Sequence, residues 1–302
     1  MLQLLGILRP ADTLGGPPKL IGIMTPTSLI GGHVSVAGGL ATGGLAYMAE
    51  IGAEMIQVFV TNPRAWALTA GKPDQDAALA ESGVDTFVHV PYLANFGSPN
   101  PETLAGSVEL VRYTLRRGVE IGAKGVVVHT GSAVTQPRDD ALRQLREHLL
   151  PLLDEIPDSG PDLLLEPMAG QGAMLCATVQ DLEPYLATLD WHPRAGICLD
   201  TCHAFSAGHD LVAEGGVTET FDALHAIAPG RLKLIHANDS KDACGSKKDR
   251  HENIGAGQIG AQPFADLMRH PAVAGVPICI ETPGKADKHR EDLETLKKLR
   301  AS

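Results

Sequence analysis

The sequence is poor in aromatic residues, lacks any long apolar run and has no excess of positive charge. Aromatic residues make up 4% of the 302 residues and hydrophobic residues 44%, so aliphatic side chains must form most of the core. No apolar run approaches the roughly 20 residues that a membrane-spanning helix requires, which predicts a protein without a membrane partner. The net charge of -11 argues against a protein that coats nucleic acid with a generally basic surface.

Several familiar chemical motifs are also missing. The cysteines at 176, 198, 202, 244 and 279 include no Cys-x-x-Cys pair, so we expect reduced thiols in a cytoplasmic protein rather than a disulfide framework. No Gly-x-Ser-x-Gly sequence is present, which argues against the serine nucleophile of the α/β-hydrolases. Residues 255–260 match the dinucleotide pattern Gly-x-Gly-x-x-Gly by letter. They follow polar residues rather than an apolar strand, and therefore do not predict a Rossmann site.

The main positive feature is a series of apolar segments that alternate with helical stretches. Two such segments, at 29–34 (ending near His33) and 54–60, precede six that each end at a residue able to bind a metal. Helical stretches lie between them, for example at 101–121 and 138–156. Near-continuous apolar runs are typical of strands buried on both faces, and their alternation with helices indicates βαβ units. The six endpoints are His89, His129, Glu166, Asp200, His236 and Glu281.

This pattern predicts an α/β fold with a single (β/α)8 TIM barrel over residues 26–302. A flexible N-terminal extension is expected at 1–25, and a charged C-terminal helix near 288–300. Parallel barrels place their active sites at the C-terminal ends of the strands. The six endpoints are therefore expected to meet at one rim of the barrel.

Three histidines and three carboxylates at one rim would be costly without a counterion, because buried charges need compensation. His203, which follows Asp200 closely, and the pair Asp249 and His251 enlarge the set to nine side chains. Histidine nitrogen and carboxylate oxygen suit Zn²⁺ or Mn²⁺, and the lack of cysteine ligands favours a catalytic site. Nine ligands exceed the needs of one tetrahedral zinc, so two or three ions are expected.

Each residue alone also has an ordinary structural interpretation. A strand-end histidine can be a hydrogen-bonded core residue, and Glu166 or Asp200 can cap the following helix. Asp249 and His251 can be solvated loop residues. The joint placement of the set, rather than any single member, favours the metal site.

At these positions the sequence resembles the endonuclease IV family of zinc-dependent apurinic/apyrimidinic endonucleases. The resemblance covers about residues 28–285, and its most specific elements are Asp-Thr-Cys-His at 200–203 and Asp-Arg-His at 249–251. The other matching stretches are 32–39, 61–66, 89–93, 166–172, 236–241 and 280–282.

The resemblance implies a base excision repair enzyme that hydrolyses the phosphodiester 5′ to abasic sites in duplex DNA, leaving a 3′-hydroxyl and a 5′-deoxyribose phosphate. It implies three zinc ions, with Mn²⁺ as a substitute, in a cytoplasmic monomer associated with the nucleoid through DNA. Glu166, Asp200 and Glu281 are expected to be catalytic. Arg64, Tyr92 and Leu93 are expected to enter the DNA at the lesion. The implied ligands are His89, His129 and Glu166 for the first zinc, Glu166, Asp200, His236 and Glu281 for the second, and His203, Asp249 and His251 for the third.

The sequence departs from the family pattern in two places. Thr130 and Ala133 stand where the family usually has Pro and His, and Pro167 with Met168 replaces the usual Asn-Thr. Changes beside metal ligands can lower affinity or activity about 10–100-fold. Two alternatives stay open: a metal-dependent sugar isomerase or epimerase of the related barrel superfamily, and a catalytically weak protein that binds DNA lesions.

Overall fold

The computed structural model describes residues 27–302. The expected extension at 1–25 lies outside these residues. Among the described residues, no helix combines the length and the apolar character that a bilayer crossing requires.

Eight parallel strands form a closed barrel in the order β1-β10-β7-β6-β5-β4-β3-β2. The prediction of a (β/α)8 barrel is therefore confirmed. The apolar segments that suggested it became the strands, with ends shifted by a few residues. The strands are β1 (Ile30–His33), β2 (Ile56–Val58), β3 (Thr86–His89), β4 (Gly125–His129), β5 (Asp162–Glu166), β6 (Ala195–Asp200), β7 (Leu232–His236) and β10 (Ile278–Ile280).

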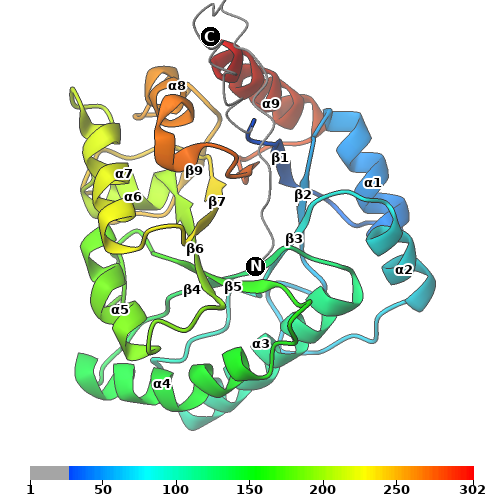
Figure 1. Ribbon diagram of the computed structural model, residues 1–302, viewed down its shortest axis with the longest axis vertical. Coiled ribbons are helices and arrows are strands. Elements are labelled where there is room, and N and C mark those ends of the chain that lie inside the picture. The colour runs from blue at the N-terminus through cyan, green and yellow to red at the C-terminus, as the bar shows by residue number, and fades with distance from the viewer. Residues whose placement is uncertain (1–26) are drawn as a thin grey trace, which may run out of the picture.

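Helices surround the barrel, as Figure 1 shows. Several begin where the sequence supplies a cap: the Asn100 side chain accepts hydrogen bonds from two backbone N–H groups at the start of α3. The expected helices at 101–121, 138–156 and 288–300 correspond to α3, α4 and α9. The helices are α1 (Leu40–Ile51), α2 (Pro73–Glu81), α3 (Pro101–Glu120), α4 (Arg138–Asp154), α5 (Leu182–Thr188), α6 (Thr201–Ala207), α7 (Gly216–Ile227), α8 (Ala261–Arg269) and α9 (Ala286–Ala301), with short 3₁₀ turns at Val179–Asp181 and Pro271–Val273.

The interior of the barrel is filled by side chains that stand directly below the strand ends. Successive strand residues point to opposite faces, so residues two apart point the same way. Buried residues such as Val127, Leu164 and Cys198 therefore lie below His129, Glu166 and Asp200. This register turns the predicted ligands into the mouth of the barrel. The interior cluster is Met55, Phe87, Val127, Leu164, Cys198, Leu234 and Cys279.

A small hairpin that the sequence did not predict stands beyond β7. Its strands, β8 (Asp239–Ser240) and β9 (His251–Glu252), pair antiparallel and belong to a separate two-stranded sheet. Each strand has two residues, which is too short to give a recognisable apolar alternation. The segment between them carries Asp249 and ends at His251.

Candidate metal centre

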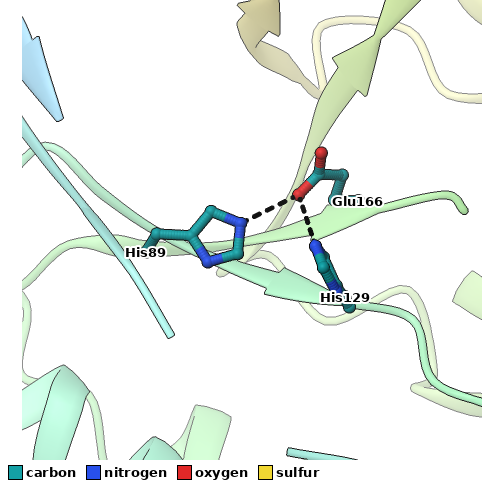
Figure 2. Close-up of side chains that lie close together, drawn as sticks. All are labelled: His89, His129 and Glu166. Carbon is teal, nitrogen blue, oxygen red and sulfur yellow. Dashed lines mark hydrogen bonds and ion pairs between the residues drawn. The ribbon is translucent and has the colours of Figure 1, made fainter. Parts of the chain in front are cut away.

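The first group of site residues consists of His89, His129 and Glu166 (Figure 2). His89 and His129 come from the ends of β3 and β4, and both direct Nε2 at Oε2 of Glu166 on β5. The distances are 3.2 Å from His89 and 3.5 Å from His129. Glu166 is fully buried. Two imidazoles and one carboxylate thus share one small region of the mouth.

The second group consists of Glu166, Asp200, His236 and Glu281. Nδ1 of His236 lies 3.0 Å from Oε1 of Glu166 and 3.3 Å from Oε2 of Glu281. Oδ2 of Asp200 is 3.9 Å from the same nitrogen. Glu166 therefore faces the first group with one oxygen and the second group with the other.

The third group consists of His203, Asp249 and His251. The two oxygens of Asp249 lie 3.2 Å from Nε2 of His203 and 3.2 Å from Nε2 of His251. Asp200 joins this group to the second, since its Oδ2 is 3.6 Å from Nε2 of His251. Its Oδ1 also accepts from the His203 N–H and caps α6. The capping interpretation and the site interpretation of Asp200 thus both describe the structure.

The orientation of the imidazole rings fits metal ions at these groups. In proteins that bind metals, the ring nitrogen away from the metal usually donates to a carbonyl or carboxylate, which fixes the tautomer. Here Nδ1 of His89 lies 2.7 Å from the Val90 carbonyl oxygen, and Nδ1 of His203 lies 3.1 Å from that of Pro167. In His203 and His251, Nε2 is buried and lies 3.2 Å from an Asp249 oxygen, but among residues 27–302 it makes no contact with the geometry of a hydrogen bond. Both nitrogens are therefore placed to donate a lone pair to a cation.

Comparisons with known proteins identify the family. The family model described as a xylose isomerase-like TIM barrel matches residues 45–299. A protein of Streptomyces avermitilis named probable endonuclease 4 is 58% identical over 276 residues, which cover 89% of this chain and 89% of that protein. A protein of the same name from Streptomyces coelicolor is 57% identical over 276 residues, which cover 89% of this chain and 94% of that protein. The chain belongs to the endonuclease IV family.

Solved structures agree with this assignment. Endonuclease IV from Thermus thermophilus matches with a TM-score of 0.79 and 28% identity, covering 90% of this chain and 98% of that one. A D-tagatose 3-epimerase-like protein matches with a TM-score of 0.66 and 21% identity, covering 90% and 98% of the two chains. The second likeness shows the barrel fold alone.

The electrostatics of this endonuclease IV-family site favour charged histidines in the absence of a cation. Burial lowers the pKa of His203, but the carboxylates around it, Asp200 first, outweigh burial and raise the pKa to about 10. Burial is likewise outweighed at His251, whose pKa rises to about 9. Burial alone would raise the pKa of Asp249, but the two neighbouring histidines have the greater effect and lower it. His129 behaves differently, since burial prevails and lowers its pKa to about 4.

Gln57 is a site residue that the sequence analysis did not identify. It is fully buried in β2. Its Nε2 donates to Oε1 of Glu281 at 2.6 Å, and its Oε1 lies 2.9 Å from Nε2 of His236. The amide oxygen thus holds a proton on Nε2 of His236 and leaves Nδ1 facing the carboxylates. The amide nitrogen also lies 3.0 Å from Nδ1 of His33.

Asn238 holds one carboxylate of the second group and the main chain beside another. Its Nδ2 donates to Oδ2 of Asp200 at 2.7 Å, and its Oδ1 accepts from the Glu281 N–H at 2.8 Å. His33 also reaches the second group, because its Nδ1 lies 3.3 Å from Oε1 of Glu281. One signal in the sequence could have indicated Gln57, since it is a polar residue inside an apolar strand.

The three residues expected to enter DNA lie on two loops at the rim. Arg64 is exposed, Tyr92 is half-exposed and Leu93 is partly buried. The loops are joined, since the Tyr92 N–H donates to the Pro63 carbonyl at 3.2 Å. The Tyr92 ring stacks on His129 with centroids 5.7 Å apart. The structure thus places Tyr92 next to the first group, and its role toward DNA stays a prediction.

Of the residues that depart from the family pattern, Pro167 and Met168 make contacts through their main chain and Thr130 through its hydroxyl. Pro167 offers its carbonyl oxygen to His203, and the Met168 N–H donates to the Cys176 carbonyl at 3.0 Å. The Thr130 hydroxyl donates to the same carbonyl at 2.9 Å. These contacts tie the loops after β4 and β5 together beside the metal centre.

Divalent-cation binding at the third group should release protons near pH 7. His203 and His251, with pKa values of about 10 and about 9, are charged below those values and must lose a proton to become ligands. The apparent affinity should therefore increase as the pH rises toward 9, by up to about tenfold per unit for each proton released. Calorimetric titration in buffers of different ionisation enthalpy measures this release.

Variants identify which histidines release the protons. His251→Asn should release fewer protons than the wild type. His129 is already neutral near pH 7, because its pKa is about 4, so His129→Asn should leave the proton count unchanged. The same proton release in the wild type and in His251→Asn would contradict the prediction.

Gln57→Leu should weaken divalent-cation binding about 10–100-fold, the usual effect of losing a partner that orients a ligand. The substitution removes the groups that hold Glu281 and the tautomer of His236. Competition against a chelating indicator measures the affinity. Gln262→Leu on α8 is the matched control, because that amide contacts the exposed Asp266. Equal affinities in the two variants would overturn the prediction.

Proposed function

We propose that this chain is a zinc-dependent endonuclease of DNA repair. It hydrolyses the phosphodiester 5′ to an abasic site in duplex DNA and leaves a 3′-hydroxyl and a 5′-deoxyribose phosphate. The proposal rests on the meeting of three ligand groups at the barrel mouth, in a chain whose relatives bear the name probable endonuclease 4. Its substrate is duplex DNA that contains abasic sites, and it acts as a monomer in the cytoplasm, associated with the nucleoid through DNA.

The donor sets would hold three ions, with Mn²⁺ as a substitute for zinc. The first group would hold one ion and the third group another, while Glu166 would connect the first ion to one in the second group. Bound divalent ions supply Lewis acidity toward the phosphate and lower the pKa of water. Three such ions outweigh the four carboxylates, so the mouth would attract a phosphate although the chain is acidic.

The residues of this chain position the reacting groups. Glu166 holds both oxygens toward histidines of different groups. Asn238 holds the carboxylate of Asp200 and the main chain of Glu281, and Gln57 donates to the carboxylate of Glu281. Side chains that hydrogen bonds hold in position favour catalysis, because charge stabilisation that is already in place needs no reorganisation. Glu166, Asp200 and Glu281 are thus the proposed catalytic residues.

The rim loops would select the lesion. An exposed cation at Arg64 and an apolar edge at Tyr92 and Leu93 suit a wedge that fills a stack lacking one base. An abasic nucleotide has no base to unstack or unpair, so turning it toward the mouth avoids most of a cost of a few kcal/mol. Selectivity then needs no contact with a base.

A sugar isomerase or epimerase is the second candidate, and the D-tagatose 3-epimerase-like structure shares the barrel. One or two divalent ions would suffice for that chemistry. The third group and the exposed Tyr92 loop would then have no function. A lesion-binding protein without strong catalysis is the third candidate. Incision of a defined abasic duplex, with and without a chelator and with the product ends identified, separates the three.

Glu166→Gln should reduce incision of an abasic duplex by at least about a thousandfold, because one oxygen of the carboxylate that connects two groups is lost. Gel analysis of end-labelled duplex at saturating zinc measures the rate. Glu109→Gln, on the exposed face of α3, is the matched control and should cut normally. Near-normal cutting by Glu166→Gln would argue strongly against the mechanism.

Tyr92→Ala and Leu93→Ala should weaken binding of abasic duplex without changing metal content. Loss of one stacking aromatic costs about 1–3 kcal/mol, so the affinity should fall about tenfold or more in Tyr92→Ala. Fluorescence anisotropy with uncleaved substrate and elemental analysis measure the two quantities. Val212→Ala removes an apolar residue that is 52% exposed and serves as the control. Loss of metal from Tyr92→Ala would show that its role is misplaced.

A further inference from the structure

The glycine-rich segment at 255–260 surrounds the carboxylate of Asp239. Asp239 is fully buried at the start of β8. Its Oδ2 accepts from the N–H groups of Gly255, Gly257 and Gly260 at 3.0, 3.0 and 3.1 Å. Its Oδ1 accepts from Ile259 at 2.8 Å and from Ser240 at 2.7 Å. Five backbone donors thus hold one side chain.

The glycines are required by this arrangement. Gly255 and Gly260 have φ values of 79° and 76°, which glycine adopts without the steric cost of other residues. A Cβ on Gly257 would lie 2.4 Å from the Ser240 carbonyl oxygen and 2.5 Å from Oδ1 of Asp239. Successive backbone N–H groups form anion-binding concavities in proteins. The Gly-x-Gly-x-x-Gly pattern is therefore such a concavity, and its anion is a carboxylate of the same chain.

This carboxylate clamp, Asp239 with residues 255–260, fixes the hairpin that carries two members of the third group. Ser240, next to Asp239, pairs with His251 across the hairpin. The Lys241 N–H donates to the Arg250 carbonyl at 3.0 Å. The position of His251 relative to the barrel therefore depends directly on the position of Asp239.

The chain is held by hydrogen bonds on both sides of Asp249. On one side, the Ser206 hydroxyl on α6 donates to the Lys248 carbonyl at 2.8 Å. On the other side, Nδ1 of His251 lies 3.2 Å from the Glu281 carbonyl oxygen. His203 belongs to α6, while His251 belongs to the hairpin. The third group therefore forms only when the hairpin is held against α6.

We propose that Asp239 is a positioning residue for the third group: the clamp holds the β8–β9 hairpin so that Asp249 and His251 meet His203. The proposal rests on the metal-binding part of the proposed function. The clamp lies outside the three ligand groups. Its loss acts on metal binding first through Asp249 and His251, because the ligands of the first and second groups stand on, or directly after, strands of the barrel.

Asp239→Asn tests this with a minimal change of shape. The new NH₂ group faces at least two backbone N–H donors in place of an acceptor, so the segment at 255–260 must shift. Purified metal-free chain is titrated with Zn²⁺ against a chelating indicator, and the number and affinity of the sites are determined. One site should weaken about 10–100-fold, while the others keep their affinity. Asp287→Asn, at a carboxylate that is 91% exposed on α9, should bind like the wild type.

A mutant cycle separates positioning from general stabilisation. If Asp239 acts only on the third group, Asp249→Ala/His251→Ala and the triple variant that adds Asp239→Asn should show the same metal binding. Effects that add would overturn the proposal. Equal weakening of every site in Asp239→Asn, or unchanged binding with a lowered urea midpoint, would overturn it as well.

A milder variant guards against misfolding of Asp239→Asn. Gly255→Ala keeps all five donors and the carboxylate but strains a backbone with positive φ, and it should weaken the same single site several-fold. Zn²⁺ binding by Gly255→Ala that equals the wild type would count against the clamp. The incision assay separates the two proposals. A wild-type chain that fills its sites but cuts no abasic duplex sinks the proposed function, whereas the clamp is judged by metal binding alone.

Discussion

Charge compensation among four carboxylates and five histidines is the constraint on which the site depends. The barrel enforces their meeting, because every second residue of a parallel strand points inward and the layer below is apolar and fully buried. Buried carboxylates are costly unless they are paired. In the absence of a cation the compensation comes from protons, and the pKa values of His203 and His251 rise for that reason. Divalent ions at these groups would therefore compete with protons for the same nitrogens, and their binding would depend on pH.

The sequence predicted the strand ends and the residue types that stand there, because both follow from local rules. An apolar run that stops at His129 or Glu166 is visible in the sequence, and the barrel rule then brings such ends together. The fold prediction is confirmed on this basis, while the ligand assignment stays a prediction that the geometry supports. Gln57 gave only the weaker signal of a polar residue inside an apolar strand. Its partners His236 and Glu281 lie 179 and 224 positions away, and a glutamine within a strand has no metal-binding pattern of its own.

The glycine-rich segment matches a dinucleotide-binding pattern and does form an anion-binding concavity. The anion that it binds is a carboxylate of the same chain rather than a dinucleotide. The sequence context excluded a dinucleotide, since no apolar strand precedes residue 255. The sequence did not identify Asp239 as the anion. Asp239 and the segment are brought together by a hairpin whose strands have only two residues each, which is too short to predict. The pattern encodes a set of inward-pointing backbone N–H groups. Whether these groups hold a ligand or a side chain is decided by the tertiary structure.

The departures from the family pattern can be weighed by the atoms that make the contacts. The tautomer of His203 is fixed by the carbonyl oxygen of Pro167, which any residue at that position would offer. Thr130 replaces a residue without a hydroxyl and adds a hydrogen bond to the Cys176 carbonyl, so the loop after β4 gains a contact to the loop after β5. At Pro167 the departure therefore keeps the contact that orients His203, whereas the loss of the usual His side chain at Ala133 leaves the lesion-binding alternative open.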